Sequence, residues 1–411
     1  MKFSCCHCNF TPFAQCSQRA TQYSRTECNY NGNMKISLLG GLTPRQFLRD
    51  YWQKKPLLIR QAIPNFKGVI STANFMKLAG HQAAQSRLVT RVGRTWQITQ
   101  GPFSARALRQ LPPTHWTILI QDLNHHIDAG MALLRQFDFI PYARLDDLMV
   151  SYAAPGGGVG PHFDSYDVFL LQGEGERRWR ISAQDDHTLV KNLPLKILRN
   201  FRVEQEWILQ PGDMLYLPPG YAHDGVALSE CTTYSIGFRA ATNQEMLQQF
   251  LNHVQDELVV EGMYSDPDLA LQSSPAVIST AMVSKVDALI NGLKWKQWDV
   301  ARFLGIYLTE PKAQVYFDPP AESLTFAKFR QQAKRQGVML DRKSRMLVRP
   351  PWLFMNGDCI VLEPASAHIL RELADRWMII PKTDISDLAA RQLYAWYGDG
   401  YVRLGQLDCA L

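Results

Sequence analysis

The chain has 411 residues, of which 46% are hydrophobic and 20% are charged, and its formal net charge at pH 7 is +6. This composition excludes a largely disordered protein and allows two or three globular domains. There is no apolar run long enough to span a bilayer, no signal peptide, and no disulfide framework among the eight cysteines. We therefore expect a cytoplasmic protein without a membrane partner. Because no dense run of lysine and arginine is present, we also expect no direct readout of nucleic acid.

Residues 1–33 differ in composition from the rest of the chain. They are rich in Cys, Asn, Gln, Ser and Thr and show no apolar period. The segment holds five candidate zinc ligands: Cys5, His7, Cys8, Cys16 and Cys28. Their spacing matches no standard zinc finger. We interpret the segment as a disordered tail or as a spurious extension placed before a start at residue 34.

Short helices and strands alternate in the next part of the chain. The run Thr43-Pro44-Arg45-Gln46 predicts a helix start, with Thr as N-cap, Pro in the first turn and Gln three residues after the cap. Apolar periodicity predicts further helices over residues 72–79 and 128–137, and strands over 57–60, 88–90, 96–98 and 116–121.

From Asp146 the pattern becomes a run of short strands with turns between them, which is typical of a β-sandwich or barrel. The expected strands cover residues 147–153, 166–172, 177–182, 206–210, 213–217 and 232–239. Gln210-Pro211-Gly212-Asp213 is expected to be the tight turn between the fourth and fifth of these strands. We assign residues 34–240 to this β-rich domain.

A helical period follows over residues 241–310. Thr242-x-x-Glu245 is a capping box, and it opens an apolar face that runs to residue 259. Further helices are expected over 276–291 and 298–307. Helical spacing leaves open whether these faces serve dimerisation or ordinary packing.

The last part of the chain, residues 311–411, resembles a winged-helix module. After a boundary at Pro319-Pro320, we expect a helix over 324–335, a hairpin turning at Asn356-Gly357, helices over 364–376 and 384–395, and a strand over 401–405. The module lacks a basic recognition helix, which disfavours binding of nucleic acid through it.

Three residues of the β-rich domain form a candidate metal site: His162, Asp164 and His223. Residues two apart on a strand share a face, so the first two side chains point the same way. The third follows the rigid turn 218–220, a position that allows a ligand from an opposing strand. Two histidines and one carboxylate form the facial triad that binds Fe(II) and leaves other coordination positions open. A bare His-x-Asp also occurs in surface loops and packed cores.

An arginine in the same domain has the strand phase of an interior residue. Arg177 alternates in phase with Trp179 and Ile181, whereas Arg178 and Arg180 should face outward. A guanidinium that points into a barrel needs an anionic partner, and its planar donors match a carboxylate. The distal carboxylate of 2-oxoglutarate is one such partner, and a structural salt bridge to Asp or Glu is the alternative.

A set of short segments carries a family resemblance. The segments are 101–103, 158–169, 172–173, 177–179, 211–213, 218–220 and 234–240. Together they resemble the JmjC-type ribosomal oxygenases, in particular the bacterial YcfD-like members that hydroxylate an arginine of a large-subunit ribosomal protein. The resemblance begins near residue 34 and is densest from 146 to 240.

The resemblance implies an α+β fold with three parts. These are a double-stranded β-helix core of the JmjC or cupin-like type over 34–240, a helical dimerisation region over 241–310, and a C-terminal winged-helix domain over 311–411. The resemblance also implies that the protein is a homodimer.

The resemblance also implies the chemistry. His162, Asp164 and His223 are the implied catalytic residues and the ligands of Fe(II), and Arg177 is the implied anchor of 2-oxoglutarate. With O2 as second cosubstrate, the implied activity is hydroxylation of a side-chain carbon, on arginine in bacterial members and on histidine in eukaryotic relatives. The implied substrate is a large-subunit ribosomal protein.

Five further residues are candidates by position. Thr233 and Ser235 share a phase on the last strand and are candidate supports for 2-oxoglutarate, with inert packing as the alternative. Ser165, Tyr166 and Asp167 adjoin the metal site and are candidate substrate-binding residues, with barrel packing or a surface turn as the alternative.

Two other functions are compatible with the sequence. One is a JmjC hydroxylase or demethylase that acts on another protein, and release of formaldehyde distinguishes a demethylase. The other is a non-catalytic cupin-like module with a structural metal, which the interior arginine disfavours.

Overall fold

The computed structural model of the protein describes residues 38–93 and 95–405. Within these ranges, no helix combines the length and the apolar character needed to cross a bilayer. The candidate zinc ligands Cys5, His7, Cys8, Cys16 and Cys28 lie outside the described residues, so their interpretation stays a prediction.

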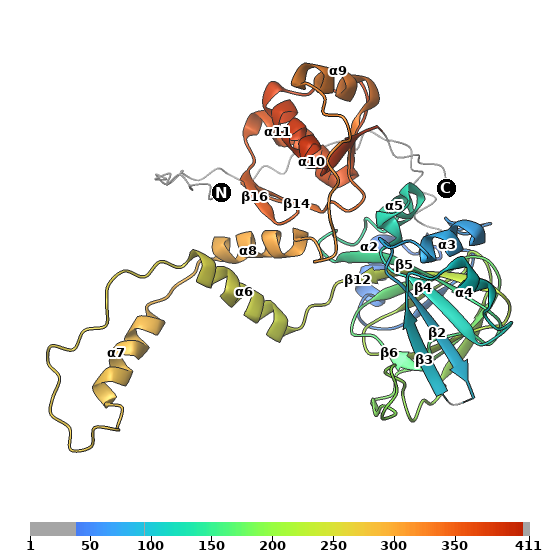
Figure 1. Cartoon of the computed structure of the whole chain (residues 1–411), viewed down its shortest axis with the longest axis horizontal. Helices are drawn as coiled ribbons and strands as arrows, with labels where there is room; N and C mark the ends of the chain where they lie inside the picture. The colour runs from blue at the N-terminus through green and yellow to red at the C-terminus, as the bar shows by residue number, and fades with distance from the viewer. Residues whose placement is uncertain (1–37, 94, 406–411) are drawn as a thin grey trace.

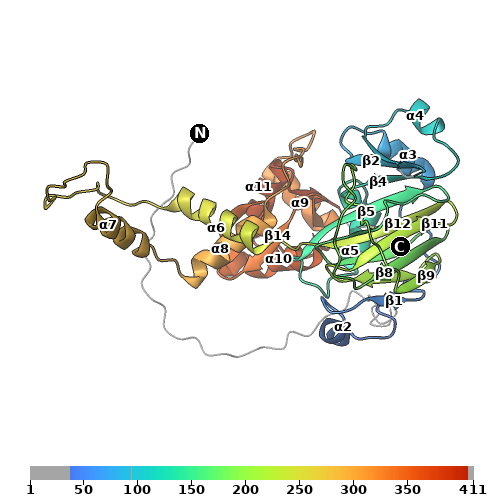
Figure 2. The same ribbon diagram turned by 90° about the horizontal axis from the view of Figure 1, so that it is seen from below.

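Two antiparallel sheets form a double-stranded β-helix (Figure 1, Figure 2). The larger sheet has, in spatial order, β1 (Leu57–Ile59), β10 (Met214–Leu217), β7 (Val168–Gln172), β12 (Cys231–Phe238), β5 (Leu145–Ala153), β4 (Trp116–Ile120), β2 (Ser86–Val92) and β3 (Thr95–Gln100). The smaller sheet has β6 (His162–Phe163), β11 (Ala222–Ala227), β8 (Arg177–Ser182) and β9 (Gln205–Leu209).

Alternate residues of the larger sheet face two different apolar cores. The outer core joins Val150 of β5 to the helices α2 (Pro44–Asp50), α3 (Thr72–Ala79) and α5 (Asp128–Arg135). The inner core joins Leu170 and Leu215 to Trp179 of the smaller sheet. Because side chains alternate along a strand, the odd-numbered residues of β5 and β12 face the space between the sheets.

The helix start predicted at Thr43 is confirmed. The Thr43 side chain accepts a hydrogen bond from the Gln46 backbone, and the Gln46 side chain accepts one from the Thr43 N–H at 2.9 Å. The helix predicted over residues 72–79 has those bounds, and two shorter elements, α4 (Ala105–Arg109) and the 3-10 turn η1 (Leu123–His125), accompany the sheet.

The strand pattern of the barrel is confirmed except in the smaller sheet. The predicted turn after β9 forms, with the Asp213 N–H donating to the Gln210 carbonyl at 2.9 Å. The strand pattern by itself includes neither β6 nor β11, although the metal-site argument places His162 on a strand and His223 on an opposing one. β6 has only two residues, and β11 contains Asp224 and Gly225, which have low strand propensity.

Two helices, α6 (Asn243–Glu257) and α7 (Thr280–Asn291), extend away from the barrel (Figure 1). The predicted N-cap of α6 forms, because the Thr242 hydroxyl accepts from the Glu245 N–H at 3.1 Å. The Glu245 carboxylate accepts a hydrogen bond from the Tyr307 hydroxyl at 2.9 Å. α7 buries none of its side chains within the single chain.

The C-terminal part has helices and two small sheets of its own. Its helices are α8 (Gln297–Thr309), α9 (Phe326–Gln336), α10 (Pro364–Arg376) and α11 (Asp387–Gly398). One sheet has β17 (Met378–Ile379), β13 (Val338–Leu340) and β18 (Val402–Leu404), and the other has β14 (Met346–Arg349), β15 (Trp352–Met355) and β16 (Asp358–Val361). The predicted hairpin turn is confirmed, since Asn356 and Gly357 have φ of 52° and 92°.

The predicted domain boundary between residues 310 and 311 stays a prediction, and α8 lies just before it. α8 packs against the sheet of β14 to β16, where a Cβ on Gly305 would lie 2.3 Å from the Phe354 ring. The Thr309 hydroxyl also accepts a hydrogen bond from the Gly357 N–H at 3.1 Å. We therefore place α8 with the C-terminal module, because it covers one face of that module's sheet.

Candidate active site

Three side chains from three strand ends converge inside the barrel mouth. His162 pairs with His223 across β6 and β11, and their ring centroids are 4.2 Å apart. The ligand atoms of His162, Asp164 and His223 all lie within 4.8 Å of one another. The closest approaches to the Asp164 carboxylate are 3.7 Å from His223 Nε2 and 4.0 Å from His162 Nε2. The predicted triad is thus brought together on one side of the cavity.

Both histidines have the tautomer that a metal ligand needs. His162 Nδ1 lies 2.8 Å from the Gly160 carbonyl, and His223 Nδ1 lies 2.9 Å from the Tyr221 carbonyl. A carbonyl only accepts, so each Nδ1 carries the proton and each Nε2 presents its lone pair to the cavity. Burial, together with the neighbouring His162, lowers the pKa of His223 to about 4, so this imidazole is neutral at neutral pH.

The glycine run before His162 allows a close approach of two backbones. A Cβ on Gly158 would lie 2.5 Å from the Gly225 carbonyl oxygen of β11. Gly160 has a φ of +78°, in the left-handed region that favours glycine. The run therefore lets the chain cross against β11 and present His162 beside His223.

Arg177 lies inside the barrel, as its strand phase predicts. It is 4% exposed, and its neighbours in phase, Trp179 and Ile181, are 5% and 1% exposed. Arg178 and Arg180 are partly exposed and lie 4.0 Å and 2.7 Å from the Glu206 carboxylate.

The guanidinium of Arg177 lacks the carboxylate partner that the alternative interpretation requires. Its Nε and Nη2 atoms are buried without a hydrogen-bond partner, and no ion pair joins it to any Asp or Glu within residues 38–93 and 95–405. It lies 5.7 Å from the centroid of the Trp179 ring. A buried guanidinium with two unpaired donor atoms is suited to bind an anion from outside the chain, and the dicarboxylate 2-oxoglutarate has the matching chemistry.

Thr233 and Ser235 lie on the inner face of β12, where they are 2% and 8% exposed. They stand opposite Ser151 and Met149 of β5. The Thr233 hydroxyl donates to the Gln172 side chain at 3.2 Å. Both hydroxyls thus face the space between the two sheets, and their role toward a cosubstrate stays a prediction.

The three residues after the triad's aspartate separate into two groups. Ser165 and Tyr166 are exposed at the mouth of the barrel. Asp167 is fully buried, and its carboxylate accepts hydrogen bonds from the Tyr216 hydroxyl at 2.6 Å and from Gln53 Nε2 at 2.9 Å. Asp167 therefore packs within the protein, and its assignment to the substrate side stays a prediction.

Asp147 is a buried acidic residue that sequence reasoning missed. It lies near the start of β5, where the pairing with β12 is irregular, and its Oδ1 would lie 3.1 Å from a Cβ on Gly237 of that neighbouring strand. Burial, followed by the charge of Asp146, raises the pKa of Asp147 to about 6. Burial and then the carboxylates of Asp164 and Asp147 raise the pKa of Tyr166, so this phenol lies near both. An acidic residue at the start of an expected strand was the available signal.

Comparison with known proteins assigns the two main parts of the chain. A sequence model of the JmjC domain matches residues 132–246, and one of the ROXA-like winged helix matches residues 292–402. Ribosomal protein uL16 3-hydroxylase of Escherichia coli (strain K12) is 35% identical over 286 residues, 67% of this chain and 73% of that protein. The chain belongs to the JmjC-domain ribosomal oxygenases. As a member of this family it is a 2-oxoglutarate-dependent oxygenase with a JmjC core and a winged-helix domain, as predicted.

A second relative and a solved structure support this assignment. A probable ribosomal oxygenase of Haemophilus influenzae is 37% identical over 234 residues, 56% of each chain. The structure of YcfD, a ribosomal oxygenase from Escherichia coli, in complex with cobalt and 2-oxoglutarate, matches with a TM-score of 0.77 and 30% identity. That match covers 89% of this chain and 99% of the other. The winged-helix match starts at residue 292, before α8, which agrees with the packing of α8 on the C-terminal sheet.

Proposed function

We propose that this oxygenase hydroxylates an arginine side-chain carbon of a large-subunit ribosomal protein, with Fe(II), 2-oxoglutarate and O2. The observation that carries the proposal is the buried, unpartnered guanidinium of Arg177 in the cavity that holds the His-Asp-His triad. The relative from Escherichia coli named for uL16 supports a ribosomal substrate, and uL16 is the first candidate. Ribosomes are cytoplasmic in bacteria, which agrees with the predicted localisation.

The chain's own residues have distinct tasks in this proposal. His162, Asp164 and His223 hold the metal from one side and leave the cavity side open. Arg177 fixes the distal carboxylate of 2-oxoglutarate, and the hydroxyls of β12 support it. When bound, the metal and 2-oxoglutarate supply the oxidising power that inserts one oxygen atom into an unactivated C–H bond.

A buried carboxylate of β5 favours a cationic substrate. Asp147 is 7% exposed, and a buried carboxylate gains most from a partner with fixed charge and several donors. Burial, and then the charges of Asp164 and Asp147, raise the pKa of the Tyr166 phenol. We propose that Asp147 pairs with the guanidinium of the substrate arginine and that Tyr166 forms one wall, with Ser165 at the entrance.

We also propose that the protein is a homodimer through its helical region. Leu247 and Leu251 of α6 are 61% and 57% exposed, and Leu289 and Ile290 of α7 are 56% and 59% exposed. Because an isolated helix of this length is marginal in water, α7 needs a packing partner, and a second copy of the same region offers an equally apolar surface. Light scattering coupled to gel filtration measures the mass that decides between one copy and two.

The substrate proposal has a direct test. The protein is incubated with Fe(II), ascorbate, 2-oxoglutarate and large ribosomal subunits, and the intact masses of the ribosomal proteins are measured. We expect one protein to gain a single oxygen atom, with fragmentation placing it on an arginine, and His162→Ala to abolish the gain. Turnover of 2-oxoglutarate without any mass change would overturn the substrate assignment. Release of formaldehyde would instead support the alternative demethylase.

A further inference from the structure

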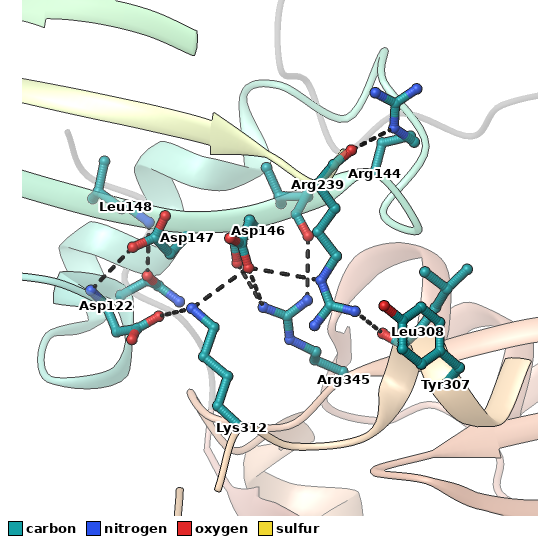
Figure 3. A network of polar contacts seen from close by, with 12 residues as sticks. Asp122, Arg144, Asp146, Asp147, Leu148, Arg239, Tyr307, Leu308, Lys312 and Arg345 are labelled. Carbon is teal, nitrogen blue, oxygen red and sulfur yellow. Dashed lines mark hydrogen bonds and ion pairs between the residues drawn. The ribbon is translucent and has the colours of Figure 1, made fainter. Parts of the chain in front are cut away.

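A lysine of the C-terminal part reaches the loop that holds Asp147. Lys312, which follows α8, places its Nζ 2.9 Å from Asp122 Oδ1 and 3.5 Å from Asp146 Oδ1. The backbone N–H of Asp122 in turn donates to Asp147 Oδ2 at 3.4 Å. Figure 3 shows this path, with Lys312 and Asp122 in line and the Asp146 and Asp147 carboxylates side by side above them. The C-terminal part is thus linked to the Asp147 carboxylate through Lys312 and Asp122.

Asp122 has a conformation that needs support. Its φ of 52° and ψ of 38° lie in the left-handed region, which costs free energy for a residue with a side chain. Its side chain is also 9% exposed, so its carboxylate requires a cation, and Lys312 supplies one. Without that cation, we expect the loop around Asp122 to change its conformation. The Asp122 N–H would then no longer donate to Asp147.

The residue before Asp147 is held from the same side. Asp146 Oδ1 lies 3.3 Å from Arg345 Nη2 and 3.7 Å from Arg239 Nε, in addition to Lys312 (Figure 3). Arg345 also donates to the backbone carbonyl of Asp146 at 2.7 Å. These contacts hold the start of β5, where the pairing with β12 is irregular and the Asp146 and Asp147 carboxylates lie side by side.

The charges agree with the geometry. Burial opposes the charged form of Lys312, but the carboxylates of Asp146 and Asp122 outweigh it and raise the pKa of Lys312. Lys312 therefore carries its charge at neutral pH. Its field acts on Asp147 against the effects of burial and of Asp146, and so favours the ionised carboxylate.

We propose that Lys312 is a positioning residue for the substrate-binding carboxylate Asp147, so that the docked C-terminal part belongs to the substrate site. The inference rests on the proposed function, in which Asp147 pairs with a guanidinium. Lys312 touches neither the substrate nor the triad. It holds Asp122, and Asp122 holds Asp147 in the orientation and charge state that captures a cation.

The experiment compares Lys312→Gln, Lys312→Arg and Arg342→Gln in the full chain. Arg342 is a matched control, because it also joins the C-terminal part to the barrel, through the His126 carbonyl at 3.0 Å and Asp128 at 3.6 Å. The substrates are a uL16 peptide with its arginine and the same peptide with citrulline, a neutral isostere. Mass spectrometry of the hydroxylated peptide yields KM and kcat, and the KM for 2-oxoglutarate is measured in parallel.

We expect Lys312→Gln to raise the KM for the arginine peptide by about 3- to 30-fold. The kcat and the KM for 2-oxoglutarate should stay within about twofold, and discrimination against citrulline should fall. Lys312→Arg should restore most of the affinity because it keeps the cation, and Arg342→Gln should behave as the unaltered protein. If Lys312→Gln does not fold, Lys312→Met tests the same path, because it removes the charge and keeps the apolar stem, and it should raise the KM in the same way.

Asp147→Asn separates the two possible failures. If this variant leaves the KM for the arginine peptide unchanged, the proposed cation-binding role of Asp147 is wrong and the inference fails with it. If it raises that KM while Lys312→Gln does not, only the inference fails. Equal effects of Lys312→Gln and Arg342→Gln would also overturn it, because they would show a general effect of domain docking.

Discussion

Replacement of Arg177 by methionine tests the nature of the cavity most sharply. In the absence of ligand, this guanidinium is buried with two donor atoms unpaired. Methionine has a similar length and carries no charge, so the change removes a desolvation cost. We expect Arg177→Met to stabilise the ligand-free protein by about 1–3 kcal/mol. For a domain of this size, that corresponds to about 2–4 °C in Tm for each kcal/mol.

The same substitution should remove most of the affinity for 2-oxoglutarate. Loss of one partner of a buried, hydrogen-bonded charge pair costs about 2–5 kcal/mol, which weakens binding by about 30-fold to several thousandfold. Calorimetric titration of 2-oxoglutarate into protein loaded with Mn(II) under anaerobic conditions measures this loss. Thermal unfolding with and without 2-oxoglutarate measures the change in stability, and the shift produced by the ligand should disappear.

Arg178→Met is the matched control for this prediction. Arg178 is the next residue of β8, is partly exposed and lies 4.0 Å from Glu206, so its loss should change stability by less than about 1 kcal/mol and leave 2-oxoglutarate binding intact. The reasoning is refuted if Arg177→Met destabilises the ligand-free protein by about 3–5 kcal/mol and binds 2-oxoglutarate normally, since that is the behaviour of a broken buried ion pair.

Three further predictions concern the substrate side, the backbone and the assembly. Because the pKa of Asp147 is raised to about 6, its carboxylate is ionised above that pH and neutral below it. The KM for an arginine peptide should therefore rise about fourfold when the pH falls from 7.5 to 5.5. Asp147→Asn should have a high KM at both pH values. A rise of the same size in this variant would contradict the assignment. Gly158→Ala should weaken binding of Co(II) and destabilise the fold by about 1–3 kcal/mol, because the new Cβ would lie 2.5 Å from the Gly225 carbonyl oxygen. Absorption spectroscopy measures the Co(II) affinity. An unchanged affinity would show that the position of β6 does not depend on the close contact between Gly158 and Gly225. Leu289→Asp on α7 should lower the mass measured by light scattering from two copies to one while the far-ultraviolet circular dichroism of the barrel is kept, and a persistent dimer would exclude α7 from the interface.

Most of the fold and the metal site were predictable because their signals are local. The N-cap at Thr43 and the hairpin turn at Asn356 depend on a few adjacent residues, and both form as predicted. The inward position of Arg177 follows from the alternation of a single strand. The strand that carries His223 was not predictable, because Asp224 and Gly225 conceal its β character.

The local sequence did not decide where the residues that follow Asp164 lie in the structure. Tyr166 and Asp167 are consecutive, and by position each was a candidate for the substrate wall. The turn before β7 exposes the first and places the second in contact with Gln53 and Tyr216, from distant parts of the chain. Proximity along the sequence therefore did not decide which of the two faces the cavity.

The sequence alone determined the ligand set, the phase of the interior arginine and the order of the secondary structure, because each depends on neighbouring residues and on the period of one element. Only the tertiary structure showed that Asp147 is buried and that Lys312, 190 residues after Asp122, contacts that residue. Such contacts form where two parts of the chain pack together. The local sequence does not show which side chains will face each other there. The residues proposed to recognise the substrate lie in this second class, whereas the residues proposed to bind metal and cosubstrate lie mainly in the first.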